Sequence, residues 1–429
     1  MKFKSSSVIN QRIDRITSNH LVIGIDIAKE THVAGAVNFR GMQIGRILTF
    51  SNDQFGLEKL MHWAQELMKK NHLTKVVFGL ESTGHYFFNL AFWLLERGEQ
   101  VVLVNPLTTK RNKENRDNRP SKNDAKDAIT IADSVTRGYY SDWVVHDCVY
   151  RKLRCLMNER EMLTTDLTAI GNQIQTALDQ VFPEFTSVFK EWDCPRGIAT
   201  LKAFPLPSDL KALSPEEVIV RWRETGMQRA GGSRGRGHAV VLLAAARRSI
   251  GLTDIAPEIR RQIKRLLARY EGLQSQIEAV DIETSELLKQ VPMSTRKPLE
   301  EIQLSPLFVA IILGNAGDLK RYEHGRQLLA LAGLSLAEST SGKRKGQIVL
   351  SKRGRRQLRK YLYLAVIGLV SNHPAFKRWH AHNVNNLKMK KQRSIFKLIG
   401  KLARILVGLA HNGESFDENK ATELVQQAA

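Results

Sequence analysis

Four acidic residues in the first third of the chain have the types and spacing of a metal-binding carboxylate group. Asp26 interrupts the apolar run "LVIGIDIA", and Glu81 directly follows the apolar run "VVFGL". Asp124 and Asp127 are three positions apart, so they share one face if their segment is helical. Carboxylates that bridge two Mg²⁺ ions can activate and clamp a phosphodiester, and this is the chemistry that the four residues predict.

Each of these acids also has a structural interpretation. A carboxylate in an apolar run is costly to bury unless it is hydrogen-bonded, paired or bound to a cation. Asp26 can cap a turn at the end of a strand, and Lys122 and Lys126 can pair with Asp124 and Asp127. The order of a strand Asp, a strand Glu and a helical Asp-x-x-Asp pair is hard to explain by four unrelated structural roles. It therefore favours a shared metal site.

A second candidate for chemistry is a serine in a strongly basic segment. Ser341 precedes Gly342 and a run of cations, and no Asp or Glu occurs between Glu338 and Glu414. Cations around an exposed hydroxyl can stabilise developing phosphate charge, although such a run is also typical of a general nucleic-acid surface. The predicted nucleic-acid-binding residues are Lys343, Arg344, Lys345, Lys352, Arg353, Arg355, Arg356 and Arg359.

Alternating strands and helices must position the acids. Apolar or alternating stretches predict strands around Asp26 and at 32–38, 42–50, 75–82 and 100–106, with helices at 53–70 and 86–98. The chain then becomes a polar, basic loop, and helical periodicity begins at about Lys122. This order indicates a mixed α/β sheet, with Asp26 and Glu81 at the carboxyl edge where open sheets place ligands.

Two long segments carry a heptad-like rhythm instead. In residues 257–290, steps of four and three run from Ile259 to Leu287 and are broken only by Thr284. Residues 151–182 repeat the rhythm with one polar break, at Arg160. The two segments can pack antiparallel within one chain or pair between chains. Residues 190–256 predict a small helical insert in which "RAGGSRGRGH" forms a mobile loop.

The composition points to a polyanionic partner. The 429 residues include 65 Lys and Arg against 43 Asp and Glu, a net charge of +22, and this favours nucleic acid. No apolar run approaches the length of a membrane span, and the N-terminus lacks the apolar core of a secretory signal. Cys148, Cys155 and Cys194 follow no metal-ligand spacing, so we expect free thiols in a reducing cytoplasm.

The acids and their surroundings resemble the DEDD tetrad of an RNase H-like, RuvC-type domain. The stretches "IGIDIAKETH", "GLESTGHY", "LVNP" and "NDAKDA" are most similar to those of Piv-type DNA invertases and insertion-sequence 110 family transposases. The later "SGKRK", "SKRG" and "LR" resemble the C-terminal transposase domain of that family, whose nucleophilic serine matches Ser341. Ser339 and Ser351 are the nearby alternatives. Where the family carries a Pro-Gly-Ile-Gly turn, this chain reads "LSPL".

By this resemblance the chain is a DNA transposase or site-specific recombinase. Ser341 would form a phosphoserine bond with DNA, while Asp26, Glu81, Asp124 and Asp127 hold Mg²⁺, with two ions per site. The expected partners are DNA, a structured guide RNA and further copies of the chain in a dimer or tetramer, inside the bacterial cell at the nucleoid and without a membrane. The rival functions are a RuvC-like junction nuclease that uses water, a Piv-type invertase and a non-catalytic architectural binder.

The expected architecture is an α/β RNase H-like (RuvC-type) domain, then a helical coiled-coil region, then a mostly α domain. The predicted boundaries are a basic tail at 1–19, the DEDD domain at 20–147, coiled-coil helices at 148–294 with the insert 190–256, the serine-containing domain at 295–415 and a tail at 416–429. The acids and the serine are thus predicted in different domains.

Overall fold

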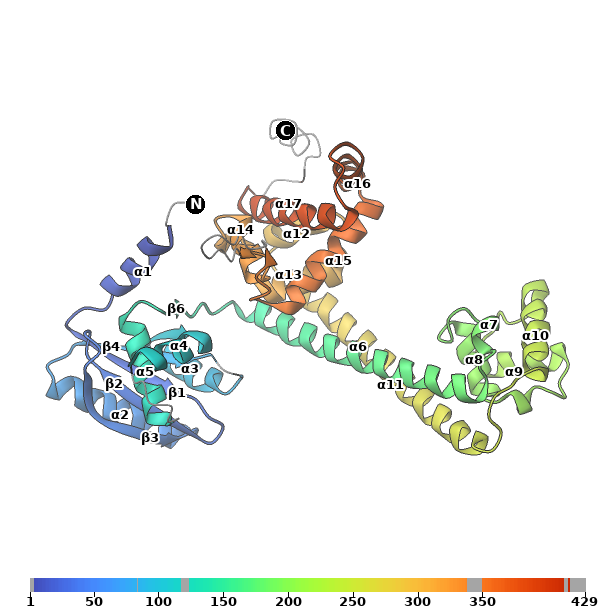
Figure 1. Cartoon of the computed structure of the whole chain (residues 1–429), viewed down its shortest axis with the longest axis horizontal. Helices are drawn as coiled ribbons and strands as arrows, with labels where there is room; N and C mark the ends of the chain where they lie inside the picture. The colour runs from blue at the N-terminus through green and yellow to red at the C-terminus, as the bar shows by residue number, and fades with distance from the viewer. Residues whose placement is uncertain (1–3, 83, 117–122, 338–348, 413–415, 417–429) are drawn as a thin grey trace, which may run out of the picture. The chain divides into compact units, whose positions relative to one another are not determined.

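The computed structural model describes residues 4–82, 84–116, 123–337, 349–412 and 416. Its contacts divide the chain into two compact units, residues 1–145 and 146–429, which we call the sheet unit and the helical unit. The prediction of a mixed α/β sheet followed by helices is confirmed (Figure 1). The predicted boundaries within the helical unit, at 294/295 and 415/416, stay predictions.

Six strands form one sheet in the order β3-β2-β1-β4-β5-β6. β4 pairs in parallel with β1 and with β5, and the other neighbours are antiparallel. The strands are β1 His20–Asp26, β2 Thr31–Val37, β3 Gln43–Ser51, β4 Lys75–Glu81, β5 Gln100–Val104 and β6 Ser141–Asp142. The helices of this unit are α1 Lys4–Asp14, α2 Gln54–Lys70, α3 Phe87–Glu96, α4 Pro106–Arg116 and α5 Asp124–Thr136.

The sheet buries both of its faces, as the apolar sequence of β1 predicts. On one face Ile23 and Phe78 share a hydrophobic core with α2 and α3. On the other face Val22, Val77 and Val102 share a core with α5. Because side chains alternate along a strand, the face to which a residue belongs follows from its position.

Three glycines in direct register let α5 lie close to the centre of the sheet. Gly24 of β1 is paired with Gly35 of β2 and with Gly79 of β4. A Cβ atom at Gly24 would lie 2.2 Å from the carbonyl oxygen of Ala128, so a larger residue would push α5 away. At Gly35 and Gly79 a Cβ atom would meet side chains of α5. The glycine row therefore sets where the start of α5 lies.

Two segments that the sequence did not predict as helices are helical in the sheet unit. α1 lies within the predicted basic tail, and the carbonyl of its Arg12 accepts a hydrogen bond from the Tyr140 hydroxyl at 3.0 Å. α4 lies within the predicted basic loop, and its Asn112 donates to the Ser134 hydroxyl of α5 at 2.8 Å. The loop prediction was wrong because contacts with other elements, and not apolar periodicity, stabilise this polar helix.

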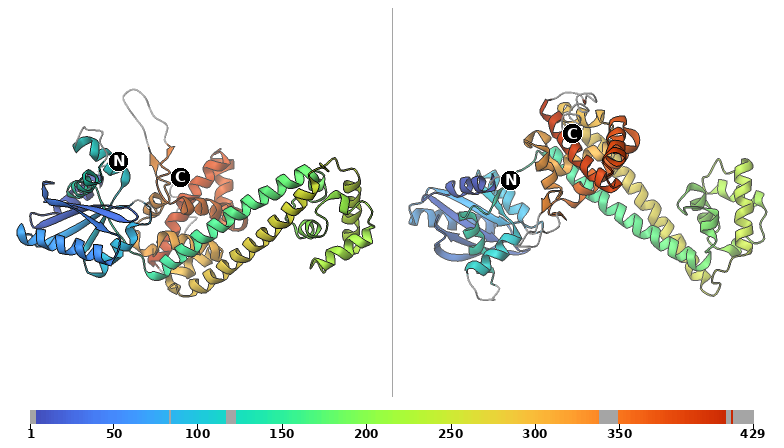
Figure 2. Two further views of the ribbon diagram at one scale, coloured as in Figure 1. Left: turned by 90° about the horizontal axis from the view of Figure 1, so that it is seen from below. Right: turned by 45° about the horizontal axis from the view of Figure 1, so that its top comes forward.

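Two long helices pack against each other within the helical unit. α6 spans Cys148–Val181 and α11 spans Ala256–Lys289, and we call this pair the arm (Figures 1 and 2). The start of α6 and the end of α11 share one hydrophobic core, and their other ends share a second core, so the helices are antiparallel. Of the two pairings that the sequence left open, the structure shows the one within a single chain.

The two polar breaks in the heptad rhythm are satisfied inside the arm. Arg160 of α6 donates two hydrogen bonds to Asp281 of α11, from Nε to Oδ1 at 2.6 Å and from Nη2 to Oδ2 at 3.0 Å. Thr284 is buried, and its hydroxyl donates to the Val280 carbonyl at 2.7 Å. A two-pronged pair between helices adds geometric specificity as well as energy. Arg160 and Asp281 therefore help to fix the register of the arm.

The insert between the arm helices folds into a helical tip with its own core. Its elements are α7 Phe185–Val188, α8 Pro195–Ala203, η1 Pro207–Asp209, α9 Pro215–Glu224 and α10 Gly232–Arg247. Trp222 is fully buried there and donates to the Thr200 hydroxyl at 2.9 Å. The prediction of a mobile loop at 229–238 was wrong, because α10 already begins at Gly232. Gly235 packs directly against the Ala230 carbonyl, and buried alanines and leucines follow.

The rest of the helical unit packs around the start of α6 and the end of α11. Its elements are α12 Met293–Glu301, α13 Pro306–Ala316, η2 Leu319–Arg321, α14 Gly325–Leu331, β7 Leu336–Ala337, β8 Val349–Leu350, α15 Arg356–Asn372, α16 Pro374–Ala381, the π-helical turn η3 His382–Asn386 and α17 Lys391–Asn412. The "LSPL" turn places Pro306 at the first position of α13, where proline is well tolerated. Within the described ranges, no helix has the length and apolar character needed to cross a membrane.

Candidate active site

Asp26 and Glu81 end two neighbouring parallel strands at the same edge of the sheet. Ile25 pairs with Leu80, so the acids that follow them are adjacent. Each acid is two positions beyond a glycine that faces α5, which puts both carboxylates on the α5 side. Both side chains are half-buried. This is the edge at which open α/β sheets bind their ligands.

The first turn of α5 carries Asp124 and Asp127. Asn123 caps the helix, because its side chain accepts a hydrogen bond from the Ala125 amide at 3.0 Å. Asp127 is buried and directly precedes Ala128, the residue that lies over the glycine row. Asp124 is exposed. The structure thus brings Asp127 close to the two strand acids and leaves Asp124 at the rim of the group.

Lys113 of α4 is a member of this group that the sequence did not single out. Its ammonium forms an ion pair with Asp127. Of the two lysines considered as partners from the sequence, Lys122 lies outside the described residues. Fourteen positions of mostly polar sequence separate Lys113 from Asp127, and no pattern in that segment relates them. Only the packing of α4 on α5 brings the two together.

The acids act on one another's ionisation. Burial, followed by the charges of Asp127 and Asp124, raises the pKa of Asp26 from 3.8 to about 6. Burial, followed by the charges of Asp26 and Asp127, raises the pKa of Glu81. Lys113 opposes both shifts. Carboxylates that raise one another's pKa in this way are stabilised by a nearby cation.

The donor chemistry of these acids suits a hard divalent cation. Carboxylate oxygens are the ligands that Mg²⁺ prefers, and a cation would reverse the mutual repulsion seen in the raised pKa values. Within the described part of the chain, however, no three acidic, histidine or cysteine side chains lie together as a finished metal-binding group. The charge and the ligand type of the acids therefore suit a divalent cation. In the structure the positive charge near them is that of Lys113, which pairs with Asp127 and acts to lower the pKa of Asp26 and Glu81.

A buried histidine supports the loop that follows Asp26. His32 of β2 is fully buried against Phe50, with ring centroids 5.2 Å apart, and burial lowers its pKa. Its Nδ1 accepts a hydrogen bond from the Ala28 amide at 3.3 Å. A neutral imidazole therefore holds the main chain two residues beyond Asp26. His32 is the last residue of the stretch "IGIDIAKETH". The sequence did not predict its supporting role, because a single histidine in a strand has no pattern that indicates its partners.

The basic serine segment is described only at its two ends. The predicted residues that lie outside the described part of the chain are Ser339, Ser341, Lys343, Arg344 and Lys345. β7 and β8 lie on either side of this segment and pair antiparallel, with Leu336 opposite Leu350. Both ends of the segment therefore belong to one two-stranded ladder in the helical unit.

The chain just after this ladder is bound to the chain just before it. The Ser351 amide donates to the Ser335 carbonyl at 2.8 Å. Gly354 approaches so closely that a Cβ atom there would lie 2.3 Å from the nitrogen of Gly333. The "SKRG" stretch is therefore packed backbone to backbone, which explains its glycine.

The described members of the predicted nucleic-acid-binding set differ in exposure. Lys352, Arg353 and Arg356 are exposed. Arg355 is half-buried, and Arg359 donates to the main-chain carbonyl at position 332 at 2.9 Å. The first three can reach a nucleic-acid backbone directly, whereas Arg359 also braces the loop before β7.

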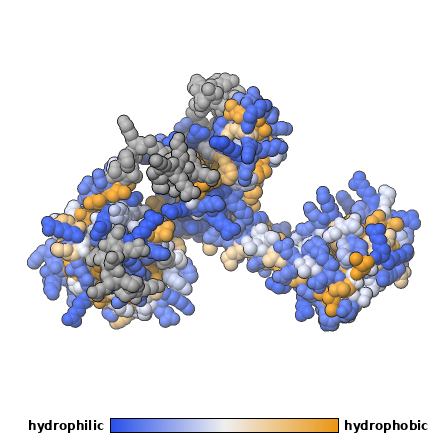
Figure 3. Space-filling view, viewed as in Figure 1, coloured by the Kyte–Doolittle hydropathy of each residue, from blue (hydrophilic) through white to orange (hydrophobic). Residues whose placement is uncertain are grey.

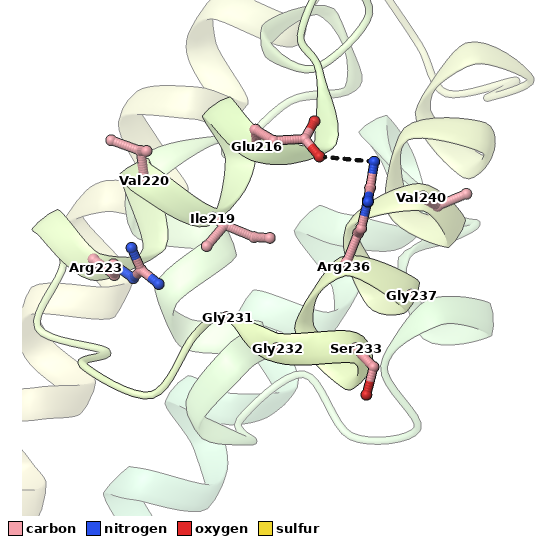
Figure 4. Close-up of a pocket in the computed structure, with 10 residues that line it drawn as sticks. All are labelled: Glu216, Ile219, Val220, Arg223, Gly231, Gly232, Ser233, Arg236, Gly237 and Val240. Carbon is pink, nitrogen blue, oxygen red and sulfur yellow. Dashed lines mark ion pairs between the residues drawn. The ribbon is translucent and has the colours of Figure 1, made fainter.

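A hollow of about 870 Å³ lies in the tip, between α9 and the start of α10 (Figure 4). Glu216 and Arg236 pair across it at 3.1 Å, and Ile219 and Val240 contribute apolar wall. Its single lining acid is already paired, so it does not have the carboxylate chemistry of the sheet edge. The face shown in Figure 3 is mainly hydrophilic, with apolar patches over the tip.

Comparisons with known proteins match both predicted catalytic regions. A profile for DEDD transposases of the IS110 type, described as "Transposase", matches residues 23–183. A second profile, "Transposase IS116/IS110/IS902 family", matches residues 302–381. The first match contains all four acids, and the second contains Ser341. The DEDD match indicates dependence on a divalent metal.

Individual proteins from three bacteria are also similar to the chain. The "Insertion element IS116 uncharacterized 44.8 kDa protein" of Streptomyces clavuligerus is 24% identical over 352 residues, which cover 80% of this chain and 83% of that protein. The "Pilin gene-inverting protein" of Moraxella lacunata and that of Moraxella bovis are each 31% identical over 139 residues, 32% of this chain and 41% of theirs. The first similarity therefore extends over most of both chains.

Proposed function

The chain belongs to the IS110 family of transposases, and we propose that it cuts and rejoins DNA through a covalent phosphoserine intermediate. As a transposase it is an enzyme of DNA recombination and binds DNA. The observation that best supports the proposal is the convergence of acids from β1, β4 and α5 at one sheet edge, since this is what metal-assisted phosphodiester chemistry requires.

We assign an RNase H-like, RuvC-type fold to the sheet unit. Support comes from the antiparallel meander of β1, β2 and β3, from the parallel pairing of β4 with β1, and from that of β5 with β4. The positions of the acids agree with this assignment, because they end β1 and β4 and begin α5.

The proposed ligands of the metal are Asp26, Glu81, Asp124 and Asp127, and the proposed metal is Mg²⁺, with two ions per site. When bound, such ions polarise a phosphodiester and compensate the charge that develops in its displacement. The chain supplies their oxygen ligands from two fixed strand ends and one helix start. Lys113 compensates Asp127 whenever that carboxylate does not face a metal ion.

Ser341 is the proposed nucleophile. Its Oγ forms a bond to phosphorus while the bond from phosphorus to one DNA oxygen breaks, and the serine proton passes to that oxygen, through solvent or a basic group, so that a free DNA hydroxyl is released. A DNA hydroxyl later attacks the phosphoserine and frees Ser341, which rejoins the strands. The exposed cations Lys352, Arg353 and Arg356 would stabilise the phosphate charge in both steps.

We further propose that the chain works as a dimer or tetramer at the chromosome and holds a structured guide RNA. The net charge of +22 supports binding of a second polyanion besides DNA. The heptad seam packs within the chain, so assembly would use the outside of the arm, where Met162 and Ile282 are exposed. Support for these partners is the family resemblance and the charge, and no contact among the described residues bears on them.

Trapping on a nicked suicide substrate tests the nucleophile. The unchanged chain should form a protein–DNA adduct that survives denaturation, and peptide mapping should place it on the segment with Ser341. Ser341→Ala should lose the adduct but keep DNA affinity, and Ser351→Ala is the matched control that should keep both. An adduct on Ser339 or Ser351 would correct the residue, and full cleavage without an adduct would favour a nuclease that uses water.

Mixing inactive variants tests whether the acids and the serine act across subunits. Asp26→Ala and Ser341→Ala should each abolish strand exchange when present alone. If each active site takes its acids from one chain and its serine from another, the mixture regains activity. Activity that stays absent would place both groups of one site in the same chain.

A further inference from the structure

Three basic side chains gather where α6 begins, α13 ends and α15 begins. Arg154 lies near the start of α6, and His146 lies two residues before the first residue of that helix. Arg355 directly precedes α15. Burial, followed by the charge of Arg154, lowers the pKa of Arg355 to about 10. Burial, followed by the charges of Arg355, Arg321 and Arg154, lowers the pKa of His146 to about 4. The three side chains therefore form one electrostatic cluster.

Close backbone packing holds this cluster on three helices. Gly314 of α13 lies so near α6 that a Cβ atom there would be 2.9 Å from the Arg154 nitrogen. Gly317 ends α13 with a φ of 72°, and a Cβ atom there would be 2.1 Å from Nδ1 of His146. Gln357 of α15 donates to a main-chain carbonyl of α6 at 2.7 Å. The positions of the three basic groups are thus fixed by the fold.

No Asp or Glu among the residues that the structure describes pairs with the half-buried Arg154 or Arg355. Among the described residues, Nη1 of Arg355 and Nδ1 of His146 are buried without a hydrogen-bond partner. Burial also lowers the pKa of Arg154. In the described part of the chain no Asp or Glu offsets the pKa shift of either arginine, and Tyr322 opposes that of Arg355 only in part. Asp147 acts on His146 alone of these three. Because an unpaired buried charge is unfavourable, an anion that enters here is bound more strongly than at an exposed arginine.

We propose that Arg154 and Arg355 bind one phosphodiester group of nucleic acid beside His146, and we call this proposed binding site the pocket. The fork of a guanidinium matches two phosphate oxygens, and two such forks can hold one phosphate. The class of ligand rests on the proposed function, since a transposase must hold nucleic acid. The exposed Arg353 and Arg356 flank Arg355 in the chain and would lead a strand to the pocket.

The pocket would hold its phosphate near the base of the serine segment. Arg355 lies five residues after β8, and its main-chain amide donates to the carbonyl of Leu331, the last residue of α14, at 2.7 Å. Arg154 and His146 were not predicted as nucleic-acid contacts, because they lie far from the basic segment in the sequence. The role that we propose for the pocket is to position a strand.

Nucleic-acid affinity of the full-length chain tests the pocket. Fluorescence anisotropy would compare Arg154→Gln and Arg355→Gln with the unchanged chain, on labelled duplex DNA and on RNA of the same sequence, over a salt series. Each variant should lose about tenfold or more in affinity for the nucleic acid that the pocket holds, as loss of a desolvated charge contact does. Arg355→Lys should recover only part of it, because lysine keeps the charge but not the fork.

Two exposed cations of the helical unit give matched controls. Lys152→Gln on α6 and Lys377→Gln on α16 should each cost only the smaller amount of one screened phosphate contact. If the Arg154 and Arg355 variants lose more affinity than the controls, the pocket is supported. Whether affinity is lost for DNA, for RNA or for both then identifies the nucleic acid that the pocket holds. Equal losses in the controls and in the Arg154 and Arg355 variants would overturn it.

Thermal unfolding separates a ligand pocket from a structural role. Removing one of two like charges relieves repulsion, so Arg154→Gln and Arg355→Gln should melt no lower than the unchanged chain. A melting temperature that falls in step with affinity would overturn the proposal. If the unchanged chain forms no phosphoserine adduct while the two variants still lose affinity, the proposed chemistry fails and the pocket stands.

Discussion

The crowding of acids around Asp26 predicts that the sheet unit of the metal-free protein becomes less stable as pH rises. The pKa of Asp26 is about 6 in the fold against 3.8 ordinarily, so the folded chain holds this proton more tightly than the unfolded chain. One pKa unit corresponds to about 1.4 kcal/mol, and solvent screening of the half-buried Asp26 carboxylate reduces its contribution to about 1–2 kcal/mol. This contribution is complete below pH 3.8 and is lost as pH rises through 6. Asp26→Asn removes the charge with little change of shape and should remove this loss.

Hydrogen exchange in the presence of a chelator measures the effect locally. Amides of β1 and α5 report the opening free energy of the sheet unit, which one melting curve of a two-unit chain does not isolate. Between about pH 5 and about pH 8 the Asp26 contribution to that free energy should fall by about 0.5–1 kcal/mol in the unchanged chain, after the discount for solvent screening. In Asp26→Asn only the part due to Glu81, whose pKa is also raised, should remain. Added Mg²⁺ should stabilise the unchanged chain more than the variant.

An exposed acid of the same unit is the control for this experiment. Glu96 lies on the exposed side of α3, and Glu96→Gln should keep the pH profile of the unchanged chain. Parallel profiles for Asp26→Asn and the unchanged chain would refute the reasoning. A variant that is less stable than the unchanged chain at high pH would refute it as well, because it would show that the Asp26 carboxylate stabilises the fold.

Three further changes test the packing behind the site. Lys113→Met leaves Asp127 buried without its ion-pair partner, so α5 should lose about 3 kcal/mol of opening free energy under a chelator and regain it with a divalent cation; unchanged exchange in α5 would contradict the ion pair. Gly24→Ala sets a Cβ atom against the Ala128 carbonyl and should cost about 1–3 kcal/mol in urea unfolding, and a neutral result would show that α5 can move away. Leu266→Lys puts a charge into a position that is 5% exposed, so circular dichroism should show a lower melting temperature of the helical unit. An unchanged melting temperature together with a smaller oligomer in light scattering would instead mean that the seam joins two chains.

The strand that carries Asp26 could be predicted because its sequence has few alternatives. An apolar run on both faces fits a central strand, and the alternation of side chains then fixes the face of the acid. Glu81 follows by the same reasoning on the neighbouring strand. What the sequence could not supply is the distance of α5 from the sheet, which depends on three glycines meeting in register.

Lys113 and the pocket at Arg154 could not be predicted, for a common reason. α4 has no apolar stripe, so its polar residues read as a loop and gave Lys113 no neighbours. Arg154 lies on a helix whose pattern was understood, but its partner Arg355 is 201 positions later in the chain. Periodicity identifies elements and their buried faces, and it carries no information on which polar faces meet.

Each helix of the arm has 34 residues, which at about 1.5 Å per residue is about 50 Å. The two hydrophobic cores of the helical unit lie at opposite ends of this span. A spacer built on a seven-residue rhythm changes length in steps, because a whole heptad taken from both helices draws the cores about 10 Å together and leaves their facing sides nearly unrotated. The number of heptads in the arm therefore sets the distance between the two cores. Insertions or deletions of whole heptads in both helices can change that distance while both cores stay intact.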